Sequence, residues 1–290
     1  MIRTIAVTGS EGFIGRWVVQ ALLRDPALSV IRVIRPGSAV EPLSRCRVVE
    51  ADVLAPGAHS ALEDTNTDAL IHLAWDGLSD FRSPRHLDQV DQHLEFLAAA
   101  MAGGVEKVIC VGTCLEYGLV EGELDESMTP RPIIAYAVAK AALGARFAAI
   151  ADTHGVDWAW GRLFYPYGPG QHPRSLWTSL HDAIARGDST FPMSPGAQVR
   201  DYLSAEEVGS VLARLAAHEV GGQVLNISSG RPVVLRDLVE RWVSEARSSI
   251  RLDFGVLEYP AYEPMSFWGS RTRLEGVLTR IPPLPKQEAK

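Results

Sequence analysis

Apolar positions along the first half of the chain follow two alternating periods. Short runs rich in β-branched and apolar residues are typical of buried strands, and they occupy residues 4–8, 30–34, 47–50, 69–73, 107–111 and 158–164. Segments between these runs carry apolar residues at helical spacing, in residues 13–23, 87–101 and 135–152. The pattern therefore predicts strands that alternate with helices.

This alternation predicts a doubly wound α/β fold of the Rossmann type, with parallel strands joined by right-handed crossovers. Ligands of such folds bind at the carboxyl ends of the strands. After Phe164, prolines and glycines mark a long loop, followed by helical patterns at 204–217 and 236–246 and a strand at 224–227. We expect a dinucleotide-binding domain of residues 1–165 with 201–230, and a smaller, interwoven C-terminal substrate lobe of residues 166–200 with 231–290.

Composition narrows the partners of the protein. The 290 residues are 47% hydrophobic, which suits a globular core, and the net charge of −7 argues against nucleic-acid binding. The three cysteines, Cys46, Cys110 and Cys114, have neither disulfide-scaffold nor metal-site spacing. No apolar run approaches the roughly 18 residues of a membrane span, and Met1 leads directly into a strand-like segment. We expect a cytoplasmic protein with no metal, membrane or nucleic-acid partner.

Three glycines follow the first predicted strand in the sequence T-G-S-E-G-F-I-G. Gly9 permits a tight turn, Gly12 lets the backbone approach a pyrophosphate, and Gly15 lets the helix lie close to the strand. The amino end of that helix presents free N–H groups and a partial positive charge to phosphates. This loop predicts a dinucleotide site, in which we include Phe13 and Ile14.

Arg35 ends the second predicted strand, about twenty residues beyond the last glycine. An acidic residue there would bind the ribose 2′-hydroxyl of NAD, whereas an arginine can pair with the 2′-phosphate of NADP. We therefore expect NADP(H), with Ser38 as a second contact, and keep NAD(H) as the alternative. The alternative is that Arg35 binds no cofactor and is a solvated side chain before the Pro-Gly turn.

Tyr136 and Lys140 lie four residues apart in a predicted helix, which puts both side chains on one face. A free tyrosine has a pKa of about 10, and a neighbouring ammonium stabilises the phenolate and lowers that pKa. A tyrosine so adjusted transfers a proton to or from a carbinol oxygen near neutral pH. The pair predicts a catalytic acid–base centre, with Lys140 also available to a cofactor ribose.

Further segments resemble the NAD-dependent epimerase/dehydratase family of extended short-chain dehydrogenases. The glycine spacing G-x-x-G-x-x-G, the Y-x-x-x-K pair and the G-T-C-L-E-Y-G stretch fit that family. So do R-L-F-Y-P-Y-G-P-G, R-D-Y-L and N-I-S-S-G, at residues 162–170, 200–203 and 226–230. The resemblance extends over residues 1–275 and implies an oxidoreductase that acts on a nucleotide-linked sugar.

The resemblance also implies roles for individual residues. Thr113 becomes the third catalytic residue, whose hydroxyl holds the substrate oxygen. The family's cofactor contacts carry over to Asp52, Val53, Leu73, Ala74 and Tyr165. Its substrate contacts carry over to Thr113, Tyr165 and Arg200, the last of which would bind the diphosphate, with Arg174 as a weaker candidate. We also expect Cys114, directly after Thr113, to contact the substrate. Members commonly form homodimers through two helices per subunit, so we expect a homodimer through the helices that begin at Leu87 and at Ala135.

Several positions depart from the family pattern. Tyr165 stands where an asparagine is usual, and Trp75 stands where a small residue is common. Both can line a sugar pocket, and both can equally be structural packing. Cys114 and Leu115 replace the Asp-Glu pair of the 4,6-dehydratases, and neither supplies the acid and base that elimination of water needs. We therefore exclude dehydration.

Four functions remain open at this point. The first is reduction by NADPH of the 4-keto group of an NDP-4-keto-6-deoxyhexose, with Tyr136 as the proton donor. The second is an NDP-sugar 4-epimerase that retains NAD, and the third is a reductase of a non-sugar ketone or aldehyde. The fourth is a non-catalytic NADP sensor, which the presence of both Tyr136 and Lys140 disfavours.

Overall fold

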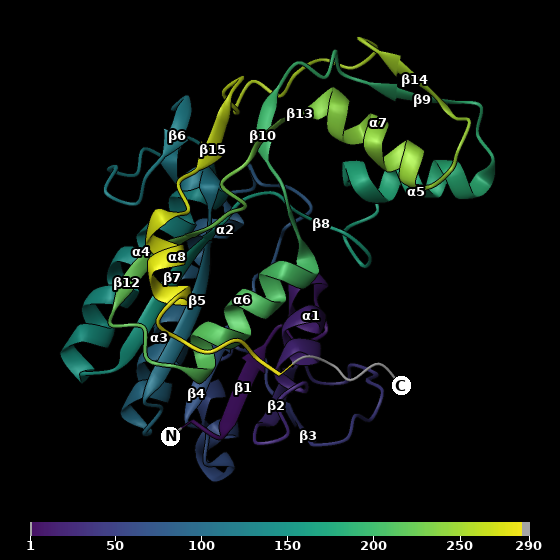
Figure 1. The fold of residues 1–290 in the computed structure, drawn as a ribbon. Coiled ribbons are helices and arrows are strands. Elements are labelled where there is room, and N and C mark those ends of the chain that lie inside the picture. Colours follow the sequence, from purple (N-terminus) through teal and green to yellow (C-terminus); the bar gives the residue numbers. More distant parts are fainter. Residues whose placement is uncertain (1, 286–290) are drawn as a thin grey trace.

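Seven parallel strands form the central sheet in the computed structural model, which describes residues 2–285. Their order is β12-β7-β5-β4-β1-β2-β3, so the direction of winding reverses beside β1 (Figure 1). This topology confirms the doubly wound α/β fold, and it brings the carboxyl ends of β1, β4, β5 and β7 to one edge. The strands span Thr4–Thr8 (β1), Ser29–Ile34 (β2), Cys46–Glu50 (β3), Ala69–His72 (β4), Lys107–Thr113 (β5), Asp157–Leu163 (β7) and Gln223–Ile227 (β12).

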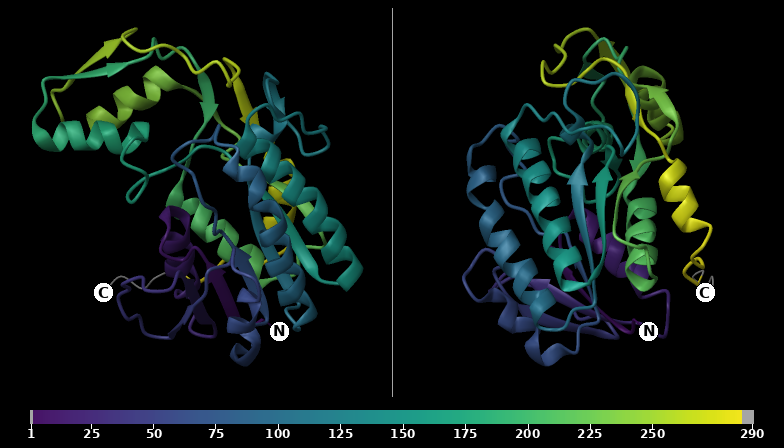
Figure 2. Two further views of the ribbon diagram at one scale, coloured as in Figure 1. Left: turned by 180° about the vertical axis from the view of Figure 1, so that it is seen from behind. Right: turned by 90° about the vertical axis from the view of Figure 1, so that its left-hand side faces the viewer.

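Helices cover both faces of the sheet (Figure 2). Because strand side chains alternate between faces, Ile5 and Val7 join one apolar core while Ala6 joins the other. The first core packs against α1 (Phe13–Leu22), α6 (Ala205–Ala217) and α8 (Thr272–Leu278). The second packs against η1 (Ala58–Thr65), α3 (Val90–Ala102) and α4 (Ala135–His154).

The helix predicted over residues 87–101 is divided in two. A short helix α2 (Arg85–Asp88) precedes α3, and Leu87, expected on the buried face, is 47% exposed. Gln89 explains the division, because its side chain both accepts from the backbone N–H of Asp76 (3.1 Å) and donates to the Asp76 carbonyl (3.2 Å). These bonds tie the start of α3 to the loop that follows β4.

The second lobe arches over the carboxyl edge of the sheet (Figure 1). Its core joins α5 (Leu176–Arg186) and α7 (Leu235–Glu245) to the parallel pair β9 (Thr190–Met193) and β14 (Arg251–Phe254). Three more two-stranded pairs connect it to the sheet. They are β10 (Val199–Asp201) with β13 (Pro232–Val234), β8 (Pro166–Tyr167) with β11 (Leu203–Ser204), and β6 (Gly122–Leu124) with β15 (Phe267–Gly269).

The predicted boundaries, 1–165 with 201–230 and 166–200 with 231–290, stay a prediction, and residues 286–290 lie outside the described part of the chain. The alternation of lobes is visible, because β12 and α6 return to the sheet after α5 and β9 have formed in the second lobe. Among residues 2–285, no helix combines the length and the apolarity that crossing a membrane requires.

Candidate active site

A cavity of about 1120 Å³ opens between the carboxyl edge of the sheet and the second lobe. Seventeen of the eighteen predicted site residues line it, and Arg200 is the exception. The cavity therefore brings together the glycine loop, the predicted catalytic residues and most of the predicted substrate contacts. Its walls include Gly9, Gly12, Phe13, Ile14, Gly15, Arg35, Asp52, Val53, Leu73, Ala74, Trp75, Thr113, Cys114, Tyr136, Lys140, Tyr165 and Arg174.

The glycine loop leaves the amino end of α1 open toward this cavity. Gly9 has φ +66°, and its carbonyl accepts the N–H of Gly12 at 2.9 Å. A Cβ atom on Gly15 would lie 2.1 Å from the Gly9 oxygen, so only glycine fits there. Gly12 caps α1 without any side-chain hydrogen bond, which leaves the first N–H groups of the helix available. This cradle fits the pyrophosphate of a dinucleotide.

Arg35 lines the cavity, but its guanidinium forms an ion pair with Asp76 of the loop after β4. Both side chains are exposed, so a ligand can compete for the arginine. Asp52 accepts the N–H of Leu54 at 3.1 Å, which fixes the turn that follows β3. The 2′-phosphate expected beside Arg35 would have to share that position with the Asp76 carboxylate.

Thr113 ends β5 and is held by a residue that sequence reasoning missed. The buried Glu116 carboxylate accepts the backbone N–H of Thr113 at 2.9 Å, and it also accepts from Arg162 Nε at 2.8 Å. Thr113 Oγ1 accepts the N–H of Leu115 at 3.3 Å. Because the hydroxyl accepts in this bond and does not donate, its proton remains available for an oxygen in the cavity.

Tyr136 and Lys140 both lie in the first turns of α4. The backbone N–H of Tyr136 donates to the carbonyl of Phe81 at 3.0 Å, and the two rings stack with centroids 4.8 Å apart. Lys140 is 3% exposed and donates to the Val111 carbonyl at 3.0 Å. Its Nζ also lies 3.9 Å from the ring centroid of Trp75.

The electrostatics correct one expectation. Burial raises the pKa of Tyr136, and the nearby Glu116 and Cys114 add to that rise. Burial lowers the pKa of Lys140 to about 8. The prediction that the ammonium lowers the pKa of Tyr136 is wrong for this structure, because desolvation dominates and the ammonium is engaged by Val111 and Trp75. Tyr136 is therefore a protonated phenol at neutral pH.

Arg200 lies behind the cavity wall and is only 1% exposed. It forms an ion pair with Glu263 at 3.0 Å and donates to the hydroxyl of Tyr165 at 3.2 Å and to the carbonyls of Val199 and Met265. With these partners, the arginine is not presented to a diphosphate as the sequence led us to expect. Arg174 does line the cavity and donates to the Ser79 carbonyl at 2.7 Å.

Three residues that depart from the family pattern lie at the cavity wall, namely Tyr165, Cys114 and Trp75. Tyr165 adopts φ +26°, an unusual conformation for a non-glycine residue, and its ring lies against Phe267. Burial raises the pKa of the Cys114 thiol, so it stays protonated at neutral pH and cannot accept a proton. Trp75 is fixed by a hydrogen bond from its indole N–H to His86 Nδ1 at 3.0 Å.

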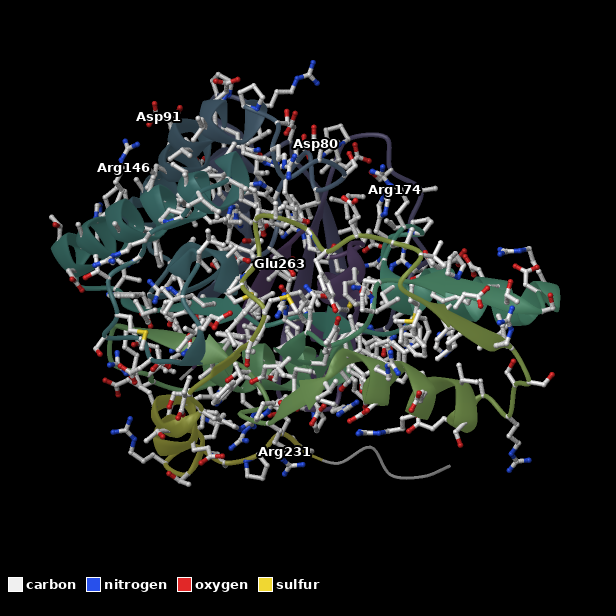
Figure 3. The ribbon with its side chains drawn as sticks, turned by 90° about the horizontal axis from the view of Figure 1, so that it is seen from above. Asp80, Asp91, Arg146, Arg174, Arg231 and Glu263 are labelled. Atoms are coloured by element: carbon white, nitrogen blue, oxygen red, sulfur yellow. The ribbon has the colours of Figure 1, made fainter. Side chains whose placement is uncertain are left out.

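Several cavity residues carried no signal in the sequence. Phe81 lies in one irregular loop and Glu263 in another, so no period or motif marked them. Figure 3 shows Glu263 near the middle of the view from above, with Arg174 on the side that carries Asp80. Within residues 2–285, no group of three or more His, Cys, Asp or Glu side chains is arranged to hold a metal ion.

The sequence model of the NAD dependent epimerase/dehydratase family matches residues 5–228 of this chain. The chain belongs to this family. It is therefore an enzyme of the NAD dependent epimerase/dehydratase family, and the matched segment contains the glycine loop, Thr113, Tyr136 and Lys140. The resemblance given by the sequence motifs is confirmed.

Two relatives of this chain are named as enzymes that act on nucleotide-linked 6-deoxy sugars. The dTDP-6-deoxy-L-talose 4-dehydrogenase (NAD(+)) of Aggregatibacter actinomycetemcomitans is 28% identical over 271 residues, which cover 92% of this chain and 99% of the relative. The GDP-6-deoxy-D-mannose reductase of Pseudomonas aeruginosa is 27% identical, over 94% of this chain and 90% of the relative.

Solved structures of similar fold include MoeE5 in complex with UDP-glucose and NAD. It has a TM-score of 0.79 and 26% identity, over 95% of this chain and 92% of MoeE5. A UDP-N-acetylglucosamine 4-epimerase from Methanobrevibacter ruminantium M1 has a TM-score of 0.84 at 22% identity, over 98% of this chain and 94% of that one. The second likeness bears on the fold alone.

Proposed function

We propose that this epimerase/dehydratase-family enzyme interconverts a ketone and an alcohol at C4 of a nucleotide-linked 6-deoxyhexose, with reduction of the 4-keto sugar as its main direction. The observation that carries the proposal is the shared cavity of the glycine loop, Thr113, Tyr136 and Lys140. Relatives named as 6-deoxyhexose 4-dehydrogenases and reductases, which cover more than nine-tenths of this chain in two cases, support the substrate class.

The protonation state of the site suits ketone reduction. The bound nicotinamide cofactor supplies the hydride. Tyr136 keeps its proton because burial raises its pKa, so it donates that proton to the oxygen that gains charge. Thr113 donates its free hydroxyl hydrogen to the same oxygen, and the Lys140 ammonium adds positive charge beside it. Cys114 and Leu115 take no part in proton transfer, which accords with the exclusion of dehydration.

For the cofactor, we infer NAD(H) rather than the NADP(H) suggested by Arg35. The Asp76 carboxylate pairs with Arg35 and opposes a second anion there. The family name, the 4-dehydrogenase relative and the NAD-bound neighbour favour the same choice. For the diphosphate, Arg174 replaces Arg200 as our candidate, because it lines the cavity. Gly9, Gly12 and Gly15 would hold the pyrophosphate of the cofactor.

A second candidate is an NDP-sugar 4-epimerase that retains its cofactor. A relative named UDP-glucose 4-epimerase, from Mycolicibacterium smegmatis, favours it, being 25% identical over 96% of this chain and 91% of the relative. An epimerase and a reductase differ in one measurable way. The epimerase needs no external reductant, whereas the reductase consumes one NADH for each sugar reduced.

The deciding experiment incubates the purified protein with dTDP-4-keto-6-deoxyglucose and either NADH or NADPH, and separately with dTDP-glucose and no added cofactor. We expect NADH oxidation with formation of a 6-deoxyhexose that is two hydrogens heavier than the keto sugar. Conversion of dTDP-glucose without consumption of NADH would favour the epimerase instead. Activity only with simple aldehydes or ketones, or cofactor binding without turnover of any substrate, would favour the reductase of non-sugar carbonyls or the sensor.

The homodimer and the cytoplasmic location stay predictions. Helices α3 and α4 are the expected dimer surface, and they pack beside each other on one face of the sheet. Light scattering after gel filtration measures the oligomeric state, and a mass of twice 31.6 kDa is the expected result.

A further inference from the structure

Trp75 has an unusual neighbour at the end of β4. The ammonium of Lys140 lies 3.9 Å from the centroid of its ring, which is within the range of a cation–π interaction. On another side, the same ammonium donates to the Val111 carbonyl at 3.0 Å. Lys140 is therefore held between an aromatic face and a carbonyl oxygen, both on the wall of the active-site cavity.

The indole of Trp75 is itself fixed from two directions. Its N–H donates to His86 Nδ1 at 3.0 Å, and the Nε2 of His86, which then carries the proton, lies 2.9 Å from the Asp80 carbonyl. One face of the indole stacks on His93, with the centroids 4.7 Å apart and the planes at 5°. The ring cannot turn away from Lys140 without breaking these contacts.

The stacked histidine connects Trp75 to the strand of the glycine loop. His93 Nδ1 lies 2.9 Å from His72 Nε2, and His72 Nδ1 lies 3.0 Å from Thr8 Oγ1. Burial lowers the pKa of His72 to about 3 and that of His93 to about 2, so both rings are neutral at physiological pH. A neutral chain of hydrogen bonds thus links Thr8, the residue before Gly9, to His93, whose ring stacks on the indole that contacts Lys140.

Burial disfavours the charge of Lys140, and among the titratable groups around it the Glu116 carboxylate is the charged one that opposes this effect. The titratable groups that face it are Cys110 on β5, Glu116 on η2 (Cys114–Tyr117), His72 on β4 and His93 on α3, with Tyr136 on its own helix. Cys110 and Tyr136 are neutral because burial raises the pKa of each, and both histidines are neutral. Glu116 is committed to Arg162, Trp160 and Thr113. The electron-rich face of Trp75 therefore adds to the attraction that the Val111 carbonyl and the Glu116 carboxylate exert on this buried ammonium.

We propose that Trp75 is a positioning residue that holds Lys140 in its charged form and directs one of its N–H groups to the reacting centre. An ammonium has three N–H groups. One donates to Val111 and one faces the indole, which leaves the third for Tyr136 or for a ribose hydroxyl of the cofactor. The use of that third group rests on the proposed function, whereas the effect of Trp75 on the charge of Lys140 does not.

The first test measures the titration of Lys140 directly. The chain has only four lysines, Lys107, Lys140, Lys286 and Lys290, so NMR of the full chain labelled with ¹³C,¹⁵N-lysine resolves few signals. The signal lost in Lys140→Arg assigns the residue. We expect Trp75→Leu to lower the Lys140 pKa by about one unit, and Trp75→Phe, which keeps an aromatic face, to lower it by roughly half as much.

An unchanged Lys140 pKa in both variants would overturn the proposal, and so would equal shifts in Trp75→Leu and Trp75→Phe. If Trp75→Leu does not fold, as judged by circular dichroism, the comparison between wild type and Trp75→Phe decides alone. A shift in Trp75→Phe then supports the proposal, and no shift overturns it.

The second test uses the reductase assay, where the rate of sugar reduction falls as Lys140 loses its proton. We expect the alkaline limb of the kcat profile in Trp75→Phe to move to lower pH by the amount seen in the NMR titration, with the KM for the sugar nucleotide changed less than twofold. If the Lys140 pKa measured by NMR moves while the alkaline limb of the kcat profile stays in place, the charge of Lys140 does not control reduction. That result would refute the role of Trp75 in the reaction. Absence of any reduction by the wild type would instead refute the proposed function and leave the NMR result intact.

Discussion

At the scale of single residues, Tyr136 and Lys140 lie one helical turn apart but respond to burial in opposite directions. Burial raises the pKa of the phenol and lowers the pKa of the ammonium to about 8. The phenol therefore stays protonated across the physiological range, while the ammonium loses its charge just above it. The two groups together limit reduction only on the alkaline side.

This difference predicts the pH dependence of ketone reduction. The reactive form needs the Tyr136 proton and the Lys140 charge, and both are present below a pH of about 8. We expect kcat/KM for the keto sugar to be level between pH 6 and 7.5 and to fall about tenfold per unit well above pH 8. Measurement of initial rates with NADH in overlapping buffers checks this, and a rate that climbs through pH 8 would contradict it.

A second residue-scale prediction concerns Asp76, which pairs with Arg35 at the cavity wall. Asp76→Asn removes the carboxylate that opposes a 2′-phosphate, and exposed ion pairs are worth up to about 1 kcal/mol. We expect the wild type to prefer NADH, and the variant to improve kcat/KM for NADPH by about three- to fivefold. Asp188→Asn, which breaks the similarly exposed pair with Arg186 outside the cavity, is the matched control and leaves the preference unchanged. A wild-type preference for NADPH would count against this account.

At the scale of elements, the glycine loop and α1 depend on a close backbone approach. A methyl group at Gly15 would meet the Gly9 carbonyl at 2.1 Å, whereas one at Gly276 in α8 meets nothing within 4 Å. Substitution by alanine therefore tests the close backbone approach at Gly15 and tests helix propensity alone at Gly276.

We expect Gly15→Ala to weaken NADH binding at least tenfold and to lower the melting temperature, since α1 must move away from β1. Gly276→Ala should bind NADH normally and gain up to about 1 kcal/mol of stability from helix propensity. Calorimetric titration with NADH and thermal unfolding measure both. Equal NADH affinity in the two variants would show that the loop does not bind the cofactor.

Elements with a strong period were predictable from the sequence, and elements formed by distant pairing were not. The strand at Thr4–Thr8 and the long helix α4 match their predicted positions closely because buried alternation and helical spacing are local signals. The strands β9 and β14 pair residues that lie about sixty positions apart, and neither has a period of its own. The break between α2 and α3 could not be predicted for a related reason, because it depends on hydrogen bonds between Gln89 and the distant loop that contains Asp76.

The site was predictable to a similar degree. Motifs marked the glycines, Thr113, Tyr136 and Lys140, and all of them reach one cavity. The residues that surround these groups had no motif. Glu116 holds Thr113 through a buried hydrogen bond. Glu263 forms an ion pair with Arg200 from a loop sixty-three residues later in the chain. The charge state of Tyr136 also required the three-dimensional structure, because burial outweighed the neighbouring lysine.

At the scale of the whole molecule, the ion pair of Arg200 with Glu263 joins the strand β10 to the loop before β15. Arg200 is 1% exposed, so loss of its partner leaves a buried charge uncompensated. We expect Glu263→Ala to lower the free energy of unfolding by about 3 kcal/mol, measured by urea denaturation. Glu258→Ala, at an exposed position in the same loop, should change it by less than about 0.5 kcal/mol. Equal effects of the two would mean that the pair does not stabilise the lobe.

The central claim is that Tyr136 donates the proton in reduction of a nucleotide-linked 4-keto sugar. The most direct measurement compares kcat with NADH and dTDP-4-keto-6-deoxyglucose in the wild type, in Tyr136→Phe and in Tyr259→Phe, whose hydroxyl accepts the Ala197 N–H away from the cavity. The account predicts a loss of about 10²- to 10⁴-fold in Tyr136→Phe with unchanged NADH binding, and wild-type activity in Tyr259→Phe. Full activity in Tyr136→Phe would contradict it.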